Sequence, residues 1–242
     1  MASATGIPDQ NPATLERGED EPLLGRAGDA SQQEEKPLAY NLILGTGIIA
    51  QAGVLILAGI IWGSVFSHKL MLFSAHPLLN SAGLLLLAQG ALILQPTHTP
   101  EQKKHGTWAH AIINPTGVLL LLGGLIVIVY NKAAHNGTHF ESPHAILGLI
   151  TYILILIQAI VGFTQYFVPQ LYGGEDNAKA IYKYHRWAGY TIFALALVTV
   201  AAATQTDFNK KVLHIQLWAV IAAAVITLAG ILPRIKKRKL GL

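Results

Sequence analysis

The sequence predicts an all-α integral membrane protein with six transmembrane helices. Two observations on composition support this fold class. Of the 242 residues, 52% are hydrophobic and only 12% are charged, far below the roughly 25% charged residues of soluble domains. Six long runs also contain no Asp, Glu, Lys or Arg. Each run is long enough to cross a hydrocarbon core of about 30 Å as a helix. Backbone groups cannot stay unpaired in lipid, so helices are the structure expected for such runs.

The charge-free runs give the elements in chain order. The first 41 residues are polar and rich in Gly, Pro, Gln and acidic residues, which predicts a disordered tail rather than a signal peptide. Residues 42–233 form one membrane domain, because the longest loop, roughly 169–184, is too short for a soluble domain. Residues 234–242 form a basic tail. The six helices are expected at approximately 42–65, 76–95, 107–130, 144–168, 185–204 and 212–232.

The distribution of basic residues predicts the orientation. With six spans, both termini lie on one side of the membrane, here called side A. Side A holds thirteen of the 17 Lys and Arg residues, and the opposite side, side B, holds Lys69, Lys132, Lys210 and Lys211. The excess predicts that side A, with both termini, is cytoplasmic. The sequon at Asn136 falls on side B, which agrees. The host membrane is expected to be an endomembrane or vesicle membrane, or the plasma membrane.

Composition also excludes several functions. The net charge of +4 is spread over helix ends, so it does not indicate a nucleic-acid partner. It suits the headgroups of the lipid bilayer instead. The chain has no cysteine, which excludes disulfides and iron–sulfur clusters.

Four of the ten histidines stand at the starts of four consecutive predicted helices. His76 and His144 begin helices that start on side B, and His110 and His185 begin helices that start on side A. Topology therefore places two facing histidines at each of two levels of a central four-helix core. Helical bundles build cofactor sites from side chains on facing helices in this way.

Two neutral imidazoles at one level suit the axial ligation of haem iron. Filling both axial positions leaves one-electron transfer as the chemistry. A zinc or copper site fits less well, because such sites usually take three or four ligands. Small residues on the same helices would leave room for a macrocycle or serve helix packing. They are Gly83, Gly90, Gly117, Gly123, Gly124, Gly148, Gly162 and Gly189. Two alternatives stay open: a histidine-lined metal or proton path in a transporter without haem, and a structural scaffold.

The segments around these histidines resemble the cytochrome b561 family over about residues 70–232. The similar segments are HPLLNSAG at His76, HAIINPTG at His110, SPHAILG at His144 and YKYHRWAGY at His185. The spacing is similar to the short, single-domain members. The resemblance implies two haems b, with His76 and His144 as iron ligands on side B and His110 and His185 on side A. It also implies transmembrane oxidoreductase activity, from cytosolic ascorbate to monodehydroascorbate or ferric iron, and a homodimer as a further expectation.

Two segments depart from the motifs of many ascorbate-using members. Residues 91–96 read ALILQP, without the Tyr and Arg of an ALLVYR-like motif, and residues 142–146 read SPHAI instead of an SLHSW-like motif. Both departures concern ascorbate handling. An alternative therefore keeps the haems and changes the donor to another small reductant or a quinol.

Polar residues near the two faces are the candidates for substrate contact. A cationic rim on side A suits an anionic donor such as ascorbate, and its members are Lys103, Lys104, His105, Lys183 and Arg186. On side B, a ferric chelate or monodehydroascorbate would meet His68, His135, His139 and Glu141. Asn114, one turn after His110, is expected to hydrogen-bond either a haem propionate or the backbone carbonyl that Pro115 leaves without a donor, and we favour the carbonyl.

Overall fold

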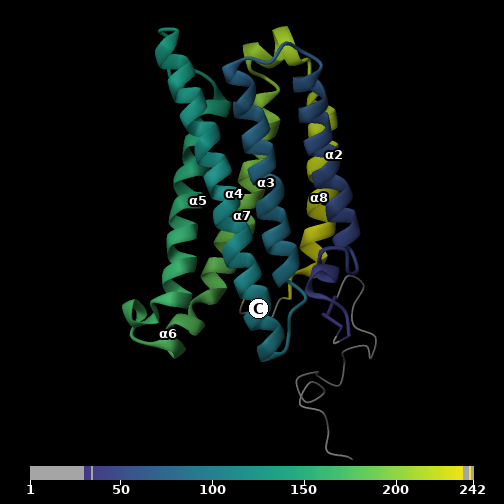
Figure 1. Cartoon of the computed structure of the whole chain (residues 1–242), viewed down its shortest axis with the longest axis vertical. Coiled ribbons are helices and arrows are strands. Elements are labelled where there is room, and N and C mark those ends of the chain that lie inside the picture. The colour runs from purple at the N-terminus through teal and green to yellow at the C-terminus, as the bar shows by residue number, and fades with distance from the viewer. Residues whose placement is uncertain (1–29, 34, 237–239, 241–242) are drawn as a thin grey trace, which may run out of the picture.

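The computed structural model describes residues 30–33, 35–236 and 240 as a bundle of helices (Figure 1). Six helices are long and apolar enough to cross a membrane, which confirms the predicted fold class. They are α2 (Gly47–Phe66), α3 (Ala75–Leu94), α4 (Pro100–Ala134), α5 (Pro143–Phe167), α7 (Tyr182–Ala203) and α8 (Leu217–Ile231). The shorter elements are η1 (Leu38–Leu42), η2 (Leu72–Ser74), η3 (Pro169–Tyr172), α6 (Glu175–Ala180), η4 (Asn209–Leu213) and η5 (Leu232–Arg234).

Two spans begin five residues later than the sequence predicted. The first was expected from residue 42, but the chain turns at Gly45, whose φ of 56° is left-handed, and α2 begins at Gly47. The last was expected from residue 212, but residues 209–213 form a π-helical turn that ends at His214 with φ 52°. Local backbone turns determine where α2 and α8 begin, and such turns cannot be predicted from hydrophobicity.

Helix α4 is longer than the predicted span of 107–130. It has 35 residues, so it is about 52 Å long at 1.5 Å per residue. Its start is fixed by a capping box in which the Thr99 hydroxyl accepts from the Gln102 amide at 3.2 Å, with Pro100 in the first turn. The added turns carry Lys103, Lys104 and His105 on a helix rather than in a loop.

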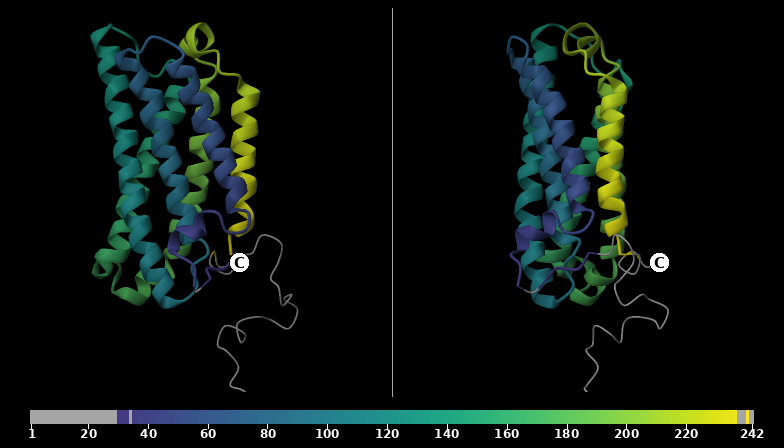
Figure 2. Two further views of the ribbon diagram at one scale, coloured as in Figure 1. Left: turned by 45° about the vertical axis from the view of Figure 1, so that its right-hand side comes forward. Right: turned by 90° about the vertical axis from the view of Figure 1, so that its right-hand side faces the viewer.

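The six spans fall into a four-helix group and a peripheral pair. Helices α3, α4, α5 and α7 form the group, and α2 packs along α8 at one side of it (Figures 1 and 2). One buried apolar cluster joins the pair to α3 and α7, with Leu57 and Val220 in its interior. A second cluster, around Val118 and Ile155, lies inside the four-helix group. The group is made of the four helices that carry the histidines. Because α4 begins at Pro100, His110 lies about three turns inside this helix and not at its start, where the sequence had predicted it.

The segment before the first span contacts the bundle at side A. Residues 1–41 were expected to form a disordered tail, and residues 1–29 and 34 lie outside the described part. Within the described part, Asn41 is buried and donates to the Ile93 carbonyl at 2.9 Å, and the Gln32 amide donates to the Pro96 carbonyl at 3.1 Å. Packing against the bundle therefore begins before the expected boundary. Of the basic tail, residues 237–239 and 241–242 lie outside the described residues.

Candidate functional site

The structure brings the four predicted histidines together in two pairs. The rings of His76 on α3 and His144 on α5 have centroids 6.1 Å apart, and their planes are inclined by 81°. The rings of His110 on α4 and His185 on α7 are 6.4 Å apart and inclined by 76°. Each pair therefore joins two helices that start on the same side.

In three of the histidines, the ring orientation is set by a hydrogen bond to a neighbouring helix. The Nδ1 atom lies against a backbone carbonyl in each case, so Nδ1 carries the proton and Nε2 is the unprotonated nitrogen. The three bonds are His76 to Gly124 at 2.9 Å, His110 to Gly90 at 2.9 Å and His144 to Thr199 at 3.0 Å. Hydrogen bonds of this kind are characteristic of metal-ligating histidines, because they fix the tautomer and the ring orientation.

The three accepting carbonyls follow one rule of register. Each accepting carbonyl lies fourteen residues after the histidine on its own helix: Gly124 after His110, Gly90 after His76, and Thr199 after His185. Fourteen residues correspond to about 21 Å of helix. In antiparallel neighbouring helices, a carbonyl of one helix therefore accepts the hydrogen bond of the other helix's histidine. The two histidine levels are separated by about the same 21 Å. The fourteen-residue spacing can be counted in the sequence, but it indicates a hydrogen bond only when the neighbouring helices are known.

His185 is the exception to this rule. The same register would place its partner at Gln158, fourteen residues after His144, but its Nδ1 has no hydrogen-bond partner among the described residues. Instead, the Gln158 side chain donates to the His185 carbonyl at 2.7 Å. The ring lies against Gly162, where an added Cβ would come within 2.7 Å of the ring Cε1. Steric contact therefore places this ring.

The favoured expectation for Asn114 is wrong. Its side-chain nitrogen lies 3.0 Å from Nε2 and 3.2 Å from Nδ1 of His110, and no bond to the carbonyl released by Pro115 is present among the described residues. An i, i+4 spacing on a helix puts the two side chains on one face. His76 and Asn80 have the same spacing, and Asn80 likewise approaches the His76 ring, at 3.3 Å.

The eight predicted glycines divide into different roles. Three of them lie beside the histidine sites, because an added Cβ would meet Asn114 at Gly90, Asn80 at Gly124 and the His185 ring at Gly162. Gly83 and Gly117 face each other's carbonyls, which is close helix packing. An added Cβ would make ordinary contacts at Gly123 and Gly148, at 3.4 and 3.8 Å, and a tight contact with the Gln158 amide at Gly189, at 3.1 Å.

The donor set fits a haem better than a polydentate metal site. Among the described residues, no group of three or more His, Cys, Asp or Glu side chains could hold a metal ion. A metal–imidazole nitrogen bond is about 2 Å long and the ring centroid lies about 1 Å further on, so two axial imidazoles of one metal have centroids about 6 Å apart. The observed 6.1 and 6.4 Å match this separation at both levels.

The five cationic residues predicted for side A lie on two different helices. Lys103, Lys104 and His105 are exposed in the first turns of α4, whereas Lys183 and Arg186 are half-buried at the start of α7. The Lys183 ammonium lies 5.2 Å from the ring centre of Tyr184. The structure therefore separates the predicted rim into two groups.

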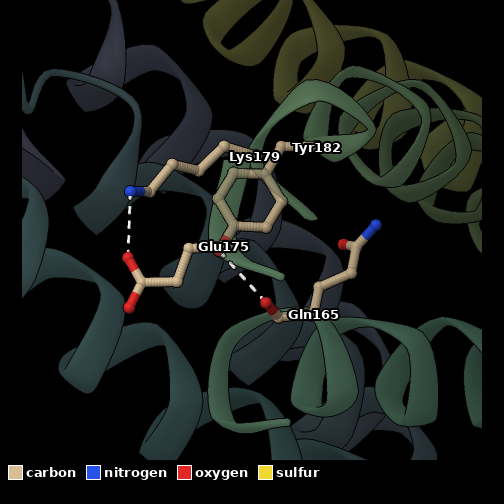
Figure 3. Close-up of polar contacts among 4 residues, drawn as sticks. All are labelled: Gln165, Glu175, Lys179 and Tyr182. Carbon is tan, nitrogen blue, oxygen red and sulfur yellow. Dashed lines mark hydrogen bonds and ion pairs between the residues drawn. The ribbon is translucent and has the colours of Figure 1, made fainter. Parts of the chain in front are cut away.

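A pocket of about 320 Å³ opens at side A beside the second group, and Figure 3 shows four of the residues that line it. It is lined by Gln165, Tyr166, Pro169, Glu175, Lys179 and Tyr182. The Lys179 ammonium and the Glu175 carboxylate form an ion pair at 3.2 Å, and the Tyr182 hydroxyl donates to the Gln165 carbonyl at 3.4 Å. Gln165 is only 3% exposed, and its Oε1 has no partner among the described residues.

This pocket lies one helical turn from the side-A histidine pair. Tyr182 precedes His185 by three residues, and Gln165 follows Gly162 by three, so each shares a helix face with its neighbour. None of the five cations predicted for side A lines the pocket. The sequence signal was weak, because the pocket residues come from two helices and from the connection between them.

The residues predicted for substrate contact on side B are all at the surface. His68, His135, His139 and Glu141 are exposed in the connections between spans. The His68 and His135 rings bond to carbonyls four residues earlier, those of Ser64 and Asn131, at 2.8 and 2.7 Å. They are accessible to a soluble acceptor.

Fold and site together define a class: helical membrane proteins with two pairs of facing histidines in a four-helix core. The model of the eukaryotic cytochrome b561 family matches residues 75–210, which is more than half of the chain and includes all four histidines. The chain therefore belongs to the eukaryotic cytochrome b561 family, whose members are transmembrane oxidoreductases that generally bind haem b. No curated protein matches the sequence.

Proposed function

We propose that this chain carries single electrons across the membrane from cytosolic ascorbate to monodehydroascorbate or a ferric chelate on the opposite face. The observation that carries this proposal is the pair of histidine levels at the two ends of one four-helix core, in a chain of the cytochrome b561 family. Side A would face the cytosol, because it holds most of the basic residues.

Two haems b would be held by His76 with His144 and by His110 with His185. When bound, haem b supplies a one-electron redox centre at each level. The protein's own contribution is the orientation of the ligands. Backbone carbonyls accept the Nδ1 protons of three histidines, which fixes the tautomer in which Nε2 is the unprotonated nitrogen and sets the direction in which each ring points.

The overall reaction balances one electron at each face. At side A, an ascorbate monoanion would lose one electron and one proton and become the monodehydroascorbate radical. At side B, a ferric chelate would gain the electron and become ferrous, or monodehydroascorbate would gain the electron with a proton and return to ascorbate.

The side-A pocket supports a small, polar donor. A hydroxylated anion would find the Tyr182 hydroxyl and the Lys179 ammonium in one pocket, where it would share Lys179 with the Glu175 carboxylate. The lysines of α4 and the start of α7 would raise the local concentration of such an anion. At side B, the exposed group of His68, His135, His139 and Glu141 suits a soluble iron chelate, because imidazole and carboxylate both bind iron.

A different small reductant or a quinol is the second candidate donor, and one observation favours it. Gln95, which stands in the segment that departs from the ALLVYR-like motif, is buried and donates to the Tyr190 hydroxyl and the Ile231 carbonyl. This side chain therefore serves packing between α3, α7 and the end of α8 rather than a donor at the rim.

A reduced-minus-oxidised optical spectrum, with haem quantified per chain, tests the proposal. We expect two low-spin haems b that ascorbate reduces, about half of which are lost in His76→Ala and in His110→Ala. Two haems that ascorbate does not reduce but a quinol does would support the second donor. A folded protein without haem, prepared with haem supplied, would contradict the proposal and favour a transport path or a scaffold.

A further inference from the structure

A chain of hydrogen bonds connects α5 to the His76 ring. The Tyr152 hydroxyl on α5 donates to Asn80 Oδ1 on α3 at 2.5 Å. The Asn80 amide nitrogen donates to the His76 carbonyl at 2.8 Å and lies 3.3 Å from His76 Nδ1. Tyr152 thus reaches the side-B histidine through one intermediate side chain.

The environment of Tyr152 makes this bond costly to lose. Tyr152 packs against the apolar cluster around Val118 and Ile155, which lies inside the four-helix group. A hydroxyl in such surroundings needs a partner, because an unsatisfied buried polar group costs the full loss of its hydration. Asn80 Oδ1 is the partner that the structure provides.

The bond also fixes which way the Asn80 amide points. With Oδ1 held by Tyr152, the amide nitrogen faces the His76 carbonyl and ring. A reversed amide would present its oxygen to His76 Nδ1 and compete with the Gly124 carbonyl for the same proton. The ring of His76 could then turn away from the orientation that Gly124 sets.

The side-A level has the same asparagine without the tyrosine. Asn114 follows His110 by four residues, as Asn80 follows His76, but Asn114 Oδ1 has no partner among the described residues. In α7, the position that matches Tyr152, eight residues after the histidine, is Phe193. A phenylalanine has no hydroxyl to donate, so the two levels differ at this point.

We propose that Tyr152 is a positioning residue that acts through Asn80 to hold the His76 ring as a ligand of the side-B haem, and that the side-A haem has no equivalent. The inference rests on the proposed ligation of that haem by His76 and His144. It assigns Tyr152 no contact with a substrate and no electron-carrying role. Its effect is on the geometry of one ligand.

The test compares Tyr152→Phe with Tyr130→Phe in the full chain loaded with haem. Tyr130 is an exposed residue of α4, so the control removes the same hydroxyl group without touching the histidines. The readouts are haem per chain, the low-spin electron paramagnetic resonance signals, the two midpoint potentials and the rate of haem loss to apomyoglobin. The signal that disappears in His76→Ala identifies the side-B haem.

We expect Tyr152→Phe to shift the resonance signal and the midpoint potential of the side-B haem while those of the side-A haem stay unchanged. The side-B haem should also dissociate about tenfold faster, because one hydrogen bond is lost and its buried partner is left without a donor. Asn80→Ala should change the same haem, and Tyr130→Phe should change neither.

The two possible failures are distinguishable. If the wild-type chain holds two haems and both signals are unaltered in Tyr152→Phe and in Asn80→Ala, the positioning role is wrong and the proposed function stands. A shift of both signals, or of the side-A signal alone, also overturns the role. If the wild-type chain binds no haem, the proposed function itself is wrong.

Discussion

Because Gly162 has no side chain, the His185 ring can lie directly against helix α5. The ring has no hydrogen bond at Nδ1 among the described residues, so van der Waals contact with α5 positions it. An added Cβ at Gly162 would be 2.7 Å from the ring Cε1, closer than packed atoms can approach. At Gly148, four residues after His144, an added Cβ would make only an ordinary van der Waals contact, with Thr199 at 3.8 Å.

At this scale we predict that Gly162→Ala lowers the haem content from two per chain to about one. The added methyl group would displace His185 from His110 and leave the side-B pair unaffected. Gly148→Ala makes the same change in the same helix and should keep both haems. Haem quantification and the reduced spectrum of the two purified variants check this. Equal haem content in the two variants would show that contact with Gly162 does not place the ring.

At the scale of elements, α2 and α8 form a pair that depends on small residues. An added Cβ at Gly53 would lie 2.8 Å from the Thr227 Cα, and one at Gly230 would meet the backbone of Ala50. Backbone-to-backbone contact of this kind leaves no room for a methyl group. The pair lies outside the four histidine-bearing helices, and α8 lies entirely outside the matched residues 75–210.

We therefore expect Gly53→Ala to lower the free energy of unfolding by about 1–3 kcal/mol, the typical cost of overpacking. Haem spectra should be unchanged, because α2 carries none of the four histidines. Gly59→Ala is the matched control in the same helix: no atom lies within 4 Å of its added Cβ, and alanine is a better helix former by roughly 0.5–1 kcal/mol. Thermal unfolding in detergent measures both. A stability loss of similar size in Gly59→Ala would point to lipid-facing effects instead.

At the scale of the whole molecule, the two ends of the described chain meet at side A. The Lys236 ammonium contacts the Ser31 hydroxyl at 3.2 Å. The Arg234 guanidinium is 2% exposed and donates to the Asn41 and Leu92 carbonyls. The segment before α2 and the segment after α8 therefore close the same end of the bundle (Figure 2).

The absence of cysteine makes the orientation directly testable. We predict that a cysteine introduced as His139→Cys reacts with a membrane-impermeant maleimide added to the non-cytoplasmic face. Lys104→Cys should react only after permeabilisation, because side A holds the basic excess that stays in the cytosol. Labelling of sealed vesicles of known orientation, with the unlabelled cysteine-free parent as the blank, measures both. The reverse pattern would invert the proposed direction of electron flow.

Much of the candidate site could be predicted from the positions of the histidines in successive helices. Each of four consecutive predicted helices has a histidine at or near its start, and the helices alternate in direction. This places His76 with His144 at one depth and His110 with His185 at the other. The partners of these rings could not be predicted. Asn114 was assigned to a backbone carbonyl and lies against His110 instead, because the rotation of a helix about its axis is set by its neighbours.

By itself, the sequence determined six spans, their alternating directions and the family, because hydrophobic length, charge and motif order act along the chain. Tertiary structure decided which carbonyl accepts each Nδ1 proton and left the His185 Nδ1 without a partner among the described residues. It also decided how Tyr152 is connected to His76 and where the side-A pocket opens. Each of these depends on how helices distant in sequence are rotated and packed against each other. In lipid, close packing and interhelical hydrogen bonds determine that arrangement, since hydrophobicity alone does not distinguish one apolar helix face from another.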